Sequence, residues 1–290
     1  MCRAIGGLAS GTGAVTAKIP DPNHPHIALM PACISLAPGG QSRFACAVKR
    51  AQAIFIAALA VWLLLTTSAV TVVTWKSPKM RAVLGMGWGL IFLWIGVGGT
   101  LMYRFREPIR EAILKIRLGW HWKFILFATL LALAEEVITT TMTNLAPLFG
   151  VKEGEAYITA STNYLDVVAL HSVVVFVPLF VGWAVILSRY AFSPFSVFWL
   201  FGLSGTLAEM SFGGPQHALE FGLWIFVYGL MVFLPACCVP SERNTRPLRW
   251  WHYVLAVFVP FLFIPVVPLP LLAGLLFPHH PKIHFPPLGQ

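Results

Sequence analysis

The sequence predicts an all-α fold, a polytopic transmembrane helix bundle with about seven spans. Two observations predict it. Of the 290 residues, 58% are hydrophobic and only 11% are charged, whereas soluble domains carry about 25% charged residues. The apolar residues are also gathered in runs close to the ~20 residues that a helix needs to cross ~30 Å of hydrocarbon. Most of the chain is therefore expected to lie in lipid.

Three regions are expected along the chain. Residues 1–50 are rich in Gly, Pro, Ala and Ser without hydrophobic periodicity, which predicts a disordered N-terminal tail. Its His24 and His26 are too few ligands to indicate a metal site by themselves. Residues 51–278 are expected to form the transmembrane helical domain, and residues 279–290 a short C-terminal tail.

Each expected span follows from one apolar run. The second run is rich in glycine, which allows helices to approach closely. The seventh carries four prolines and is expected to be kinked or re-entrant. The expected spans are residues 52–75, 82–103, 123–147, 164–188, 194–212, 216–238 and 252–277.

The basic residues between these runs predict the orientation. They are concentrated in the 104–123 connection, which has the pattern of an interfacial helix, and in the 239–251 loop. On the opposite side, Lys76, Lys79 and Arg81 depart from this pattern, whereas Lys152 is accompanied by Glu153 and Glu155. The positive-inside rule then places the N-terminus inside and the C-terminus outside, in a membrane of the bacterial plasma-membrane type.

The net charge of +9 is explained by the same pattern. Because the Lys and Arg residues flank apolar runs, they indicate topology and not a nucleic-acid partner. The expected partner is the lipid bilayer. The five cysteines show neither a metal-ligand spacing nor a disulfide framework.

The chemistry is expected to come from acidic residues inside the spans. The chain has only 11 Asp and Glu residues, and a carboxylate at the centre of a span costs ~3 kcal/mol, so such residues are functional by default. In the predicted orientation, Glu136, Glu209 and two histidines, His171 and His217, all fall in the outer half of the bilayer. The acidic residues inside the expected spans are Glu135, Glu136, Asp166, Glu209 and Glu220.

Helical spacing places several of these groups on shared faces. Glu136 shares a face with Thr140 and Thr143, and Glu135 lies on the neighbouring face with Thr139. Two adjacent carboxylates in a low-dielectric environment should not both be ionised. We therefore expect Glu136 to be the working group and Glu135 to be a protonated supporting acid.

Structural explanations remain open for each residue. The glutamate pair could be hydrogen-bonded to the local threonines, and Glu209 could be hydrogen-bonded to a polar group on a neighbouring helix. His171 could be a neutral histidine bonded to a carbonyl. Asp166 lies near a helix start, where the helix dipole favours a carboxylate, and His217 and Glu220 could simply cap and hydrate a helix end.

An adjacent glutamate pair in one span, followed by histidines on later spans, resembles the glutamic intramembrane proteases. These are the CAAX-processing and bacteriocin-processing (CPBP) family and the PrsW-type proteases. The resemblance covers roughly residues 123–225, and Ala134-Glu135-Glu136 corresponds to the Glu-Glu motif. The chain differs from the CPBP pattern in having Thr140 for Arg, Phe221 for Asn and Val167 for an aromatic residue.

The resemblance implies an enzyme without a cofactor, acting on a membrane-bound peptide or protein. A glutamate of the pair would activate a water molecule, and the histidines would position that water and stabilise the oxyanion. Glu209 would correspond to the second acidic motif of the PrsW type. The catalytic residues implied are Glu135, Glu136, His171, Glu209 and His217.

Two other functions fit the same residues. One is a metal-binding membrane enzyme, because mixed nitrogen and oxygen ligands suit zinc or iron. The other is a proton- or cation-coupled transporter, in which the carboxylates bind a cation or relay protons. The ligands expected for the metal are Glu136, His171, Glu209, His217 and Glu220.

Overall fold

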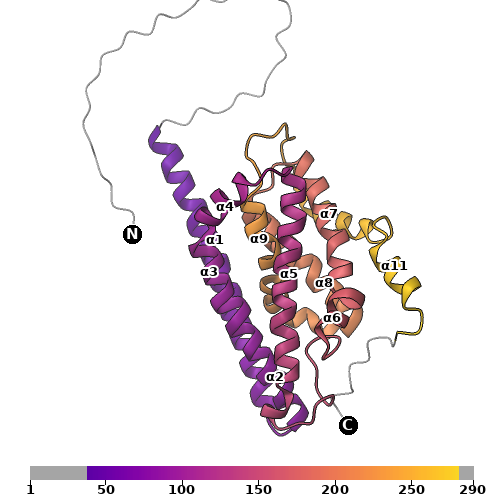
Figure 1. Ribbon diagram of the computed structural model, residues 1–290. Helices are drawn as coiled ribbons and strands as arrows, with labels where there is room; N and C mark the ends of the chain where they lie inside the picture. The colour runs from indigo at the N-terminus through magenta and orange to yellow at the C-terminus, as the bar shows by residue number, and fades with distance from the viewer. Residues whose placement is uncertain (1–37, 281–290) are drawn as a thin grey trace, which may run out of the picture. The chain divides into compact units, whose positions relative to one another are not determined.

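The described part of the chain is helical, which confirms the all-α prediction (Figure 1). The structure is a computed structural model that describes residues 38–280, with side chains from Cys46 onward. Within these residues the only β interaction is an isolated bridge between Tyr190 and Arg246. His24, His26 and most of the two expected tails lie outside the described residues.

The first half of the chain forms two long hydrophobic segments, a short surface helix and a central helix. The first helix begins at Pro38, ahead of the expected span. A π-helical stretch joins the two helices of the second segment without ending it. The elements are α1 (Pro38–Val73), α2 (Pro78–Leu90), the π-helix η1 (Ile91–Gly98), α3 (Gly99–Arg104), α4 (Arg106–Lys115) and α5 (Trp120–Asn144).

The second half contains more interruptions. The expected fourth span is bent by 47° where α6 and η3 meet α7. The elements are the 3₁₀ turn η2 (Ala146–Phe149), α6 (Tyr164–Asp166), the π-helix η3 (Val167–His171), α7 (Val173–Arg189), α8 (Pro194–Gly213), the 3₁₀ turn η4 (Pro215–Glu220), α9 (Phe221–Cys237), α10 (Trp250–Phe258), the 3₁₀ turn η5 (Val259–Phe263) and α11 (Leu269–Leu276).

These helices support a multi-pass membrane protein. Within residues 38–280, five helical segments are long and apolar enough to cross a membrane, and the bent α6–α7 segment makes a sixth. The seventh expected span is discontinuous, since Trp250–Phe263 is a shorter apolar helix that is separate from α11. Pro260 lies at the start of η5, where the helix changes to 3₁₀ geometry, and Pro268 is the N-cap of α11.

The connections alternate between two ends of the bundle. Figure 1 shows α4 and the 239–249 loop at one end, and the start of α2 and the 145–163 loop at the other. We call these the α4 end and the 145–163 end. The basic connections thus share one end, as the sequence predicts. Helix α4 has no buried residue, in agreement with a helix at the membrane surface.

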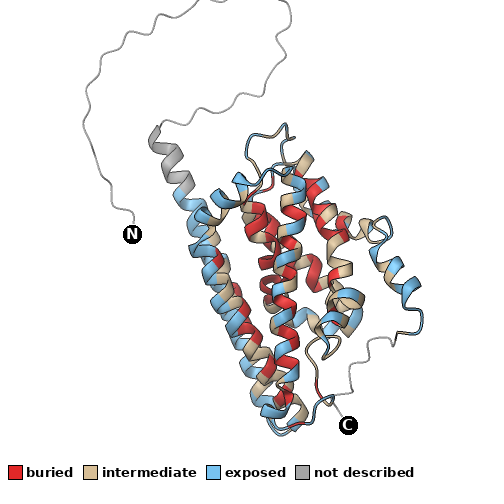
Figure 2. Cartoon of the chain, viewed as in Figure 1, coloured by how far each residue is buried: buried red, intermediate tan, exposed pale blue. Residues whose placement is uncertain are grey.

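The core is formed mainly by α5, α7, α8 and α9, and Figure 2 shows that buried residues concentrate there whereas α1 and α11 are largely exposed. Helices α8 and α9 make the most extensive contact among the described helices. Two glycines permit it. A Cβ on Gly202 would lie 2.6 Å from the Ile225 carbonyl oxygen, and one on Gly205 would collide with the Tyr228 ring. This close approach places Glu209 of α8 beside Tyr228 of α9.

Candidate functional site

The glutamate pair of α5 lies in the interior of the bundle. Glu135 is 4% exposed and Glu136 is 5% exposed. The nearby Thr139, Thr140 and Thr143 are buried as well. The polar stripe predicted from helical spacing therefore faces other helices and not lipid, as the cost of an unpartnered carboxylate in hydrocarbon requires.

Glu136 is surrounded by hydroxyl groups from three segments. The Thr139 hydroxyl lies 3.1 Å from Glu136 Oε2, and the Thr159 hydroxyl donates to the same oxygen at 3.3 Å. The Ser172 hydroxyl, at the start of α7, donates to the Val167 carbonyl at 3.2 Å and also interacts with this carboxylate. The Thr139 hydroxyl thus contacts the Glu136 carboxylate and the backbone carbonyls of Glu135 and Glu136, rather than the Glu135 carboxylate with which helical spacing had paired it.

Glu209 joins the pair from a second helix, and Tyr228 from a third. The Tyr228 hydroxyl donates a hydrogen bond to Glu209 Oε1. Glu135 interacts electrostatically with both Glu136 and Glu209, and Tyr228 interacts with all three glutamates. We call Glu135, Glu136, Glu209 and Tyr228 the carboxylate cluster. It brings together three of the expected catalytic residues.

His217 and Glu220 extend the carboxylate cluster toward the 145–163 end. The 3₁₀ geometry of η4 places residues three apart directly above one another, and His217 Nδ1 lies 2.7 Å from Glu220 Oε2. His217 interacts electrostatically with Glu209, and its ring lies 5.9 Å from that of Trp224. The two side chains are 25% and 44% exposed, so this extension approaches the surface.

His171 lies in a different group. Its electrostatic partners are Asp166 and His280, and its Nε2 is 3.7 Å from Asp166 Oδ1. Among the described residues, the one set of three His, Cys, Asp or Glu side chains whose ligand atoms all lie within 4.8 Å is Asp166, His171 and His280. The five metal ligands expected from the sequence therefore do not form a single coordination site.

Two buried donors beside the carboxylate cluster have no hydrogen-bond partner among residues 38–280. They are the Thr140 hydroxyl and the Trp224 indole N–H. The Trp224 ring lies between those of His217 and Tyr228, 5.9 Å and 6.0 Å away. A buried unsatisfied donor costs about 1–3 kcal/mol, so each calls for a functional or structural reason.

A cysteine nucleophile is not supported near the α4 end. Cys238 follows the last residue of α9 and is buried. Burial raises the pKa of its thiol to about 11. At neutral pH the thiol is therefore protonated, and a protonated thiol is a poor nucleophile and metal ligand.

Several residues of the site were not predicted from the sequence. Tyr228 had a detectable signal, because its hydroxyl stands in the middle of an otherwise apolar run. Trp224 lies in the same run. Thr159 and Ser172 had no signal in the sequence, because they reach Glu136 from a loop and from a helix start whose positions depend on the fold. His280 lies beyond the last expected span.

Comparison of the chain with family models, with curated proteins and with solved structures found no match. The fold and the site by themselves define the class, which is a multi-pass α-helical membrane protein with a buried cluster of carboxylates.

Proposed function

We propose that the protein is a membrane-embedded hydrolase of the glutamic type, with the carboxylate cluster as its active site. The observation that carries this proposal is the meeting of three glutamates from two helices in one buried cluster, beside donors that have no partner. A structural role would need only enough carboxylate to satisfy the neighbouring donors. Here the carboxylates are in excess while Trp224 and Thr140 remain unsatisfied.

Glu136 is the general base of this proposal. Its carboxylate takes a proton from a water molecule, and the water oxygen forms a bond to the carbonyl carbon of the scissile amide. The carbonyl oxygen takes up the negative charge. Breakage of the C–N bond then requires a proton on the leaving nitrogen, and Glu136 returns the one that it holds.

The orphaned donors suit the developing oxyanion. Donors that are already fixed in a water-poor site stabilise a developing charge without reorganisation. The Trp224 N–H and the Thr140 hydroxyl are such donors, and the Tyr228 hydroxyl, bonded to Glu209, is a third. His217 positions Glu209 in this scheme. His171 has no part in it, because its partners are Asp166 and His280.

The substrate class follows from the location of the carboxylate cluster. It lies within candidate membrane spans, in the half of the bundle toward the 145–163 end. A soluble substrate would have to enter the bilayer, whereas a membrane-bound peptide or protein already occupies that depth. We therefore propose such a peptide or protein as the substrate.

The experiment compares Glu136→Gln with Glu135→Gln in the full-length protein in nanodiscs, with membrane-inserted peptides as substrates and mass spectrometry of the products. Gln keeps the shape and removes the charge, so both variants should fold. Hydrolysis should fall about a hundredfold or more for Glu136→Gln, the usual contribution of a general base, and much less for Glu135→Gln. Equal, mild effects with unchanged stability would contradict the proposal.

A second candidate function is a proton- or cation-coupled transporter. It is favoured by the continuity of ionisable groups from Glu136 through Glu209 to His217 and Glu220, which are partly exposed. Such a series of neighbouring ionisable side chains relays protons in membrane proteins. Proteoliposomes with an internal pH dye separate the two functions, because only a transporter would show a flux that Glu209→Gln abolishes.

The proposed orientation places the α4 end inside and the 145–163 end outside. The arrangement of loops in Figure 1 supports it, since Lys152 and Arg246 stand in connections at opposite ends. Reporter fusions after Lys152 and after Arg246 should report the outside and the inside, respectively. Reporters on the same side of the membrane would refute the topology and the depth assigned to the carboxylate cluster.

A further inference from the structure

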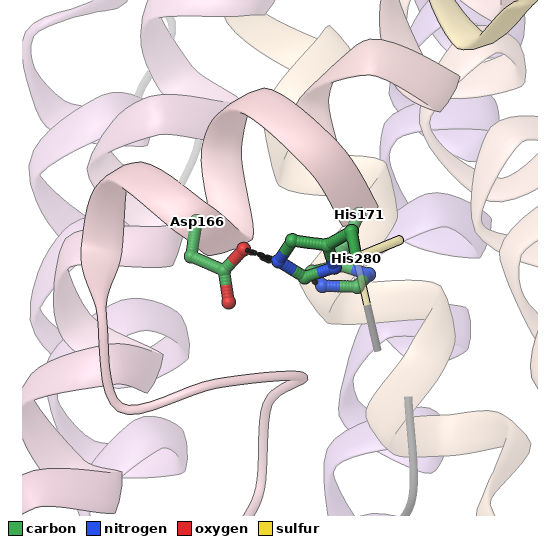
Figure 3. Close-up of side chains that lie close together, drawn as sticks. All are labelled: Asp166, His171 and His280. Atoms are coloured by element: carbon green, nitrogen blue, oxygen red, sulfur yellow. Dashed lines mark ion pairs between the residues drawn. The ribbon is translucent and has the colours of Figure 1, made fainter. Parts of the chain in front are cut away.

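A second polar group, separate from the carboxylate cluster, is formed by Asp166, His171 and His280, which we call the rim cluster. His280 Nε2 lies 2.5 Å from Asp166 Oδ1, and His171 Nε2 lies 3.7 Å from the same oxygen. The two imidazole rings are 5.0 Å apart. Figure 3 shows the Asp166 carboxylate facing both rings.

An unusual turn brings the first two of these side chains together. On an α-helix, residues five apart point about 140° away from each other. Here Val167–His171 is π-helical, and the Ser172 N–H donates to the Val167 carbonyl at 2.9 Å, an i→i+5 bond. The wider π turn places residue i+5 above residue i, and such turns occur frequently at functional sites.

The third side chain comes from the end of the described chain. Helix α11 contacts both α7 and η3, and the residues after it carry His280 back to Asp166. His279, the neighbouring residue, is exposed, whereas His280 is partly buried. The chain therefore presents one of two adjacent histidines to the rim cluster.

The donor set is that of a transition-metal site. Two imidazoles and one carboxylate are the ligands that zinc takes in sites with three protein ligands and one open position. Donors around a tetrahedral zinc at ~2.1 Å lie about 3.4 Å from one another. The two histidine nitrogens lie 2.5 Å and 3.7 Å from Asp166 Oδ1, on either side of this value, and all three ligand atoms lie within 4.8 Å of one another.

Burial supports the same assignment. The side chains of His171, Asp166 and His280 are 10%, 20% and 24% exposed, which leaves access for an ion while excluding most of the bulk water. Asp166 Oδ1, the oxygen that both histidines approach, is buried, and within the described part of the chain its contacts with them are ion pairs without hydrogen-bond geometry. An acceptor in this state is what a bound cation would satisfy.

We propose that Asp166, His171 and His280 bind one divalent transition-metal ion, with zinc as the fitting ion. The ion fastens the segment after α11 to the bent end of the α6–η3 segment. This site shares no residue with the carboxylate cluster, so it stands whether or not the protein is a hydrolase.

Zinc binding by the full-length protein tests this proposal. The protein is purified in detergent through an affinity tag without histidines, stripped with a chelator and equilibrated with micromolar free zinc. Bound metal is counted by atomic emission. We expect about one zinc per chain in the wild type and in the control His279→Ala, and a loss of affinity of more than about a hundredfold in His280→Ala and His171→Ala.

Two further measurements keep the test decisive if a variant is poorly folded. Zinc should raise the melting temperature of the wild type and of His279→Ala, but not that of His280→Ala, whose side chain lies at the edge of the bundle. Cobalt substituted for zinc should give visible absorption bands that Asp166→Asn alters. Zinc retained in full by both His280→Ala and His171→Ala, or binding only at millimolar zinc, would show that the rim cluster is merely an ion pair.

Discussion

The carboxylate cluster and the rim cluster lie toward the same end of the bundle, yet the fold holds them in different ways. The carboxylate cluster is carried by α5, α8 and α9, three long helices whose facing surfaces are buried. The rim cluster depends on one π turn and on the segment after α11. Groups on long packed helices are positioned more precisely than groups on short segments. The first arrangement suits chemistry, and the second suits a fastening that an ion completes.

The largest effect that separates the two clusters should come from Gly202→Ala. The new Cβ would lie 2.6 Å from the Ile225 carbonyl oxygen, which belongs to the backbone and cannot rotate away. The helices α8 and α9 must then move apart, at a cost of about 1–3 kcal/mol in the free energy of unfolding or more. Glu209 and Tyr228 should separate, and hydrolysis should be lost, while zinc binding at the rim cluster should persist.

Gly87→Ala is the matched control, because a Cβ at Gly87 in α2 meets no atom within 4 Å. Alanine is favoured over glycine in a helix by up to about 1 kcal/mol, so this variant should be as stable as the wild type or more stable. Thermal unfolding in detergent measures the stability of both variants, Gly202→Ala and Gly87→Ala. If Gly202→Ala were as stable and active as Gly87→Ala, the close contact of α8 and α9 would not be what positions the carboxylate cluster.

A smaller effect is expected from Tyr228→Phe, which removes only the hydroxyl that donates to Glu209. Leaving a buried acceptor without its donor costs about 1–3 kcal/mol in the free energy of unfolding. Tyr253→Phe is the control, because Tyr253 contributes ring contacts with Phe192 and Trp199. A Tyr228→Phe protein with unchanged stability and unchanged hydrolysis would remove Tyr228 from the site.

The two clusters also differ in how far the sequence could predict them. The buried face of α5 follows from helical periodicity, so the inward direction of Glu135, Glu136 and the threonines is predictable from the residue spacing alone. The position of Glu209 along its expected span likewise predicts that it lies in the same half of the bilayer as Glu136. Periodicity fails for His171, because the 47° bend and the π turn direct it to Asp166 and not to Glu136.

The remaining partners could not be predicted for a different reason. His280 follows a proline-broken run whose path is set by packing against α7 and η3, and a sequence pattern contains no such information. Thr159 reaches Glu136 because the loop after α5 folds back over that helix, and Ser172 because α7 begins beside it. Local patterns thus predicted the helices and their buried faces, whereas the long-range contacts selected which polar groups meet.

The smallest effect on stability, and the sharpest test of the carboxylate cluster, should come from Trp224→Phe. Trp224 and Trp183 each have a buried indole N–H that finds no partner among the described residues. Trp224 lies beside His217 and Tyr228, whereas Trp183 packs against Phe192 near the α4 end. Replacement by Phe removes an unsatisfied donor in both, which offsets part of the lost packing, so each change should stay within about 1–2 kcal/mol. If the Trp224 N–H binds the oxyanion, hydrolysis should fall about 10²–10³-fold for Trp224→Phe, the usual loss for one such donor, and hardly at all for Trp183→Phe. The test measures the rate of hydrolysis and the melting temperature of each variant and compares the two variants. Equal rates in the two variants would mean that the unpartnered N–H at Trp224 is a packing defect like the one at Trp183, and the oxyanion would then have to be bound by Thr140 and Tyr228 alone.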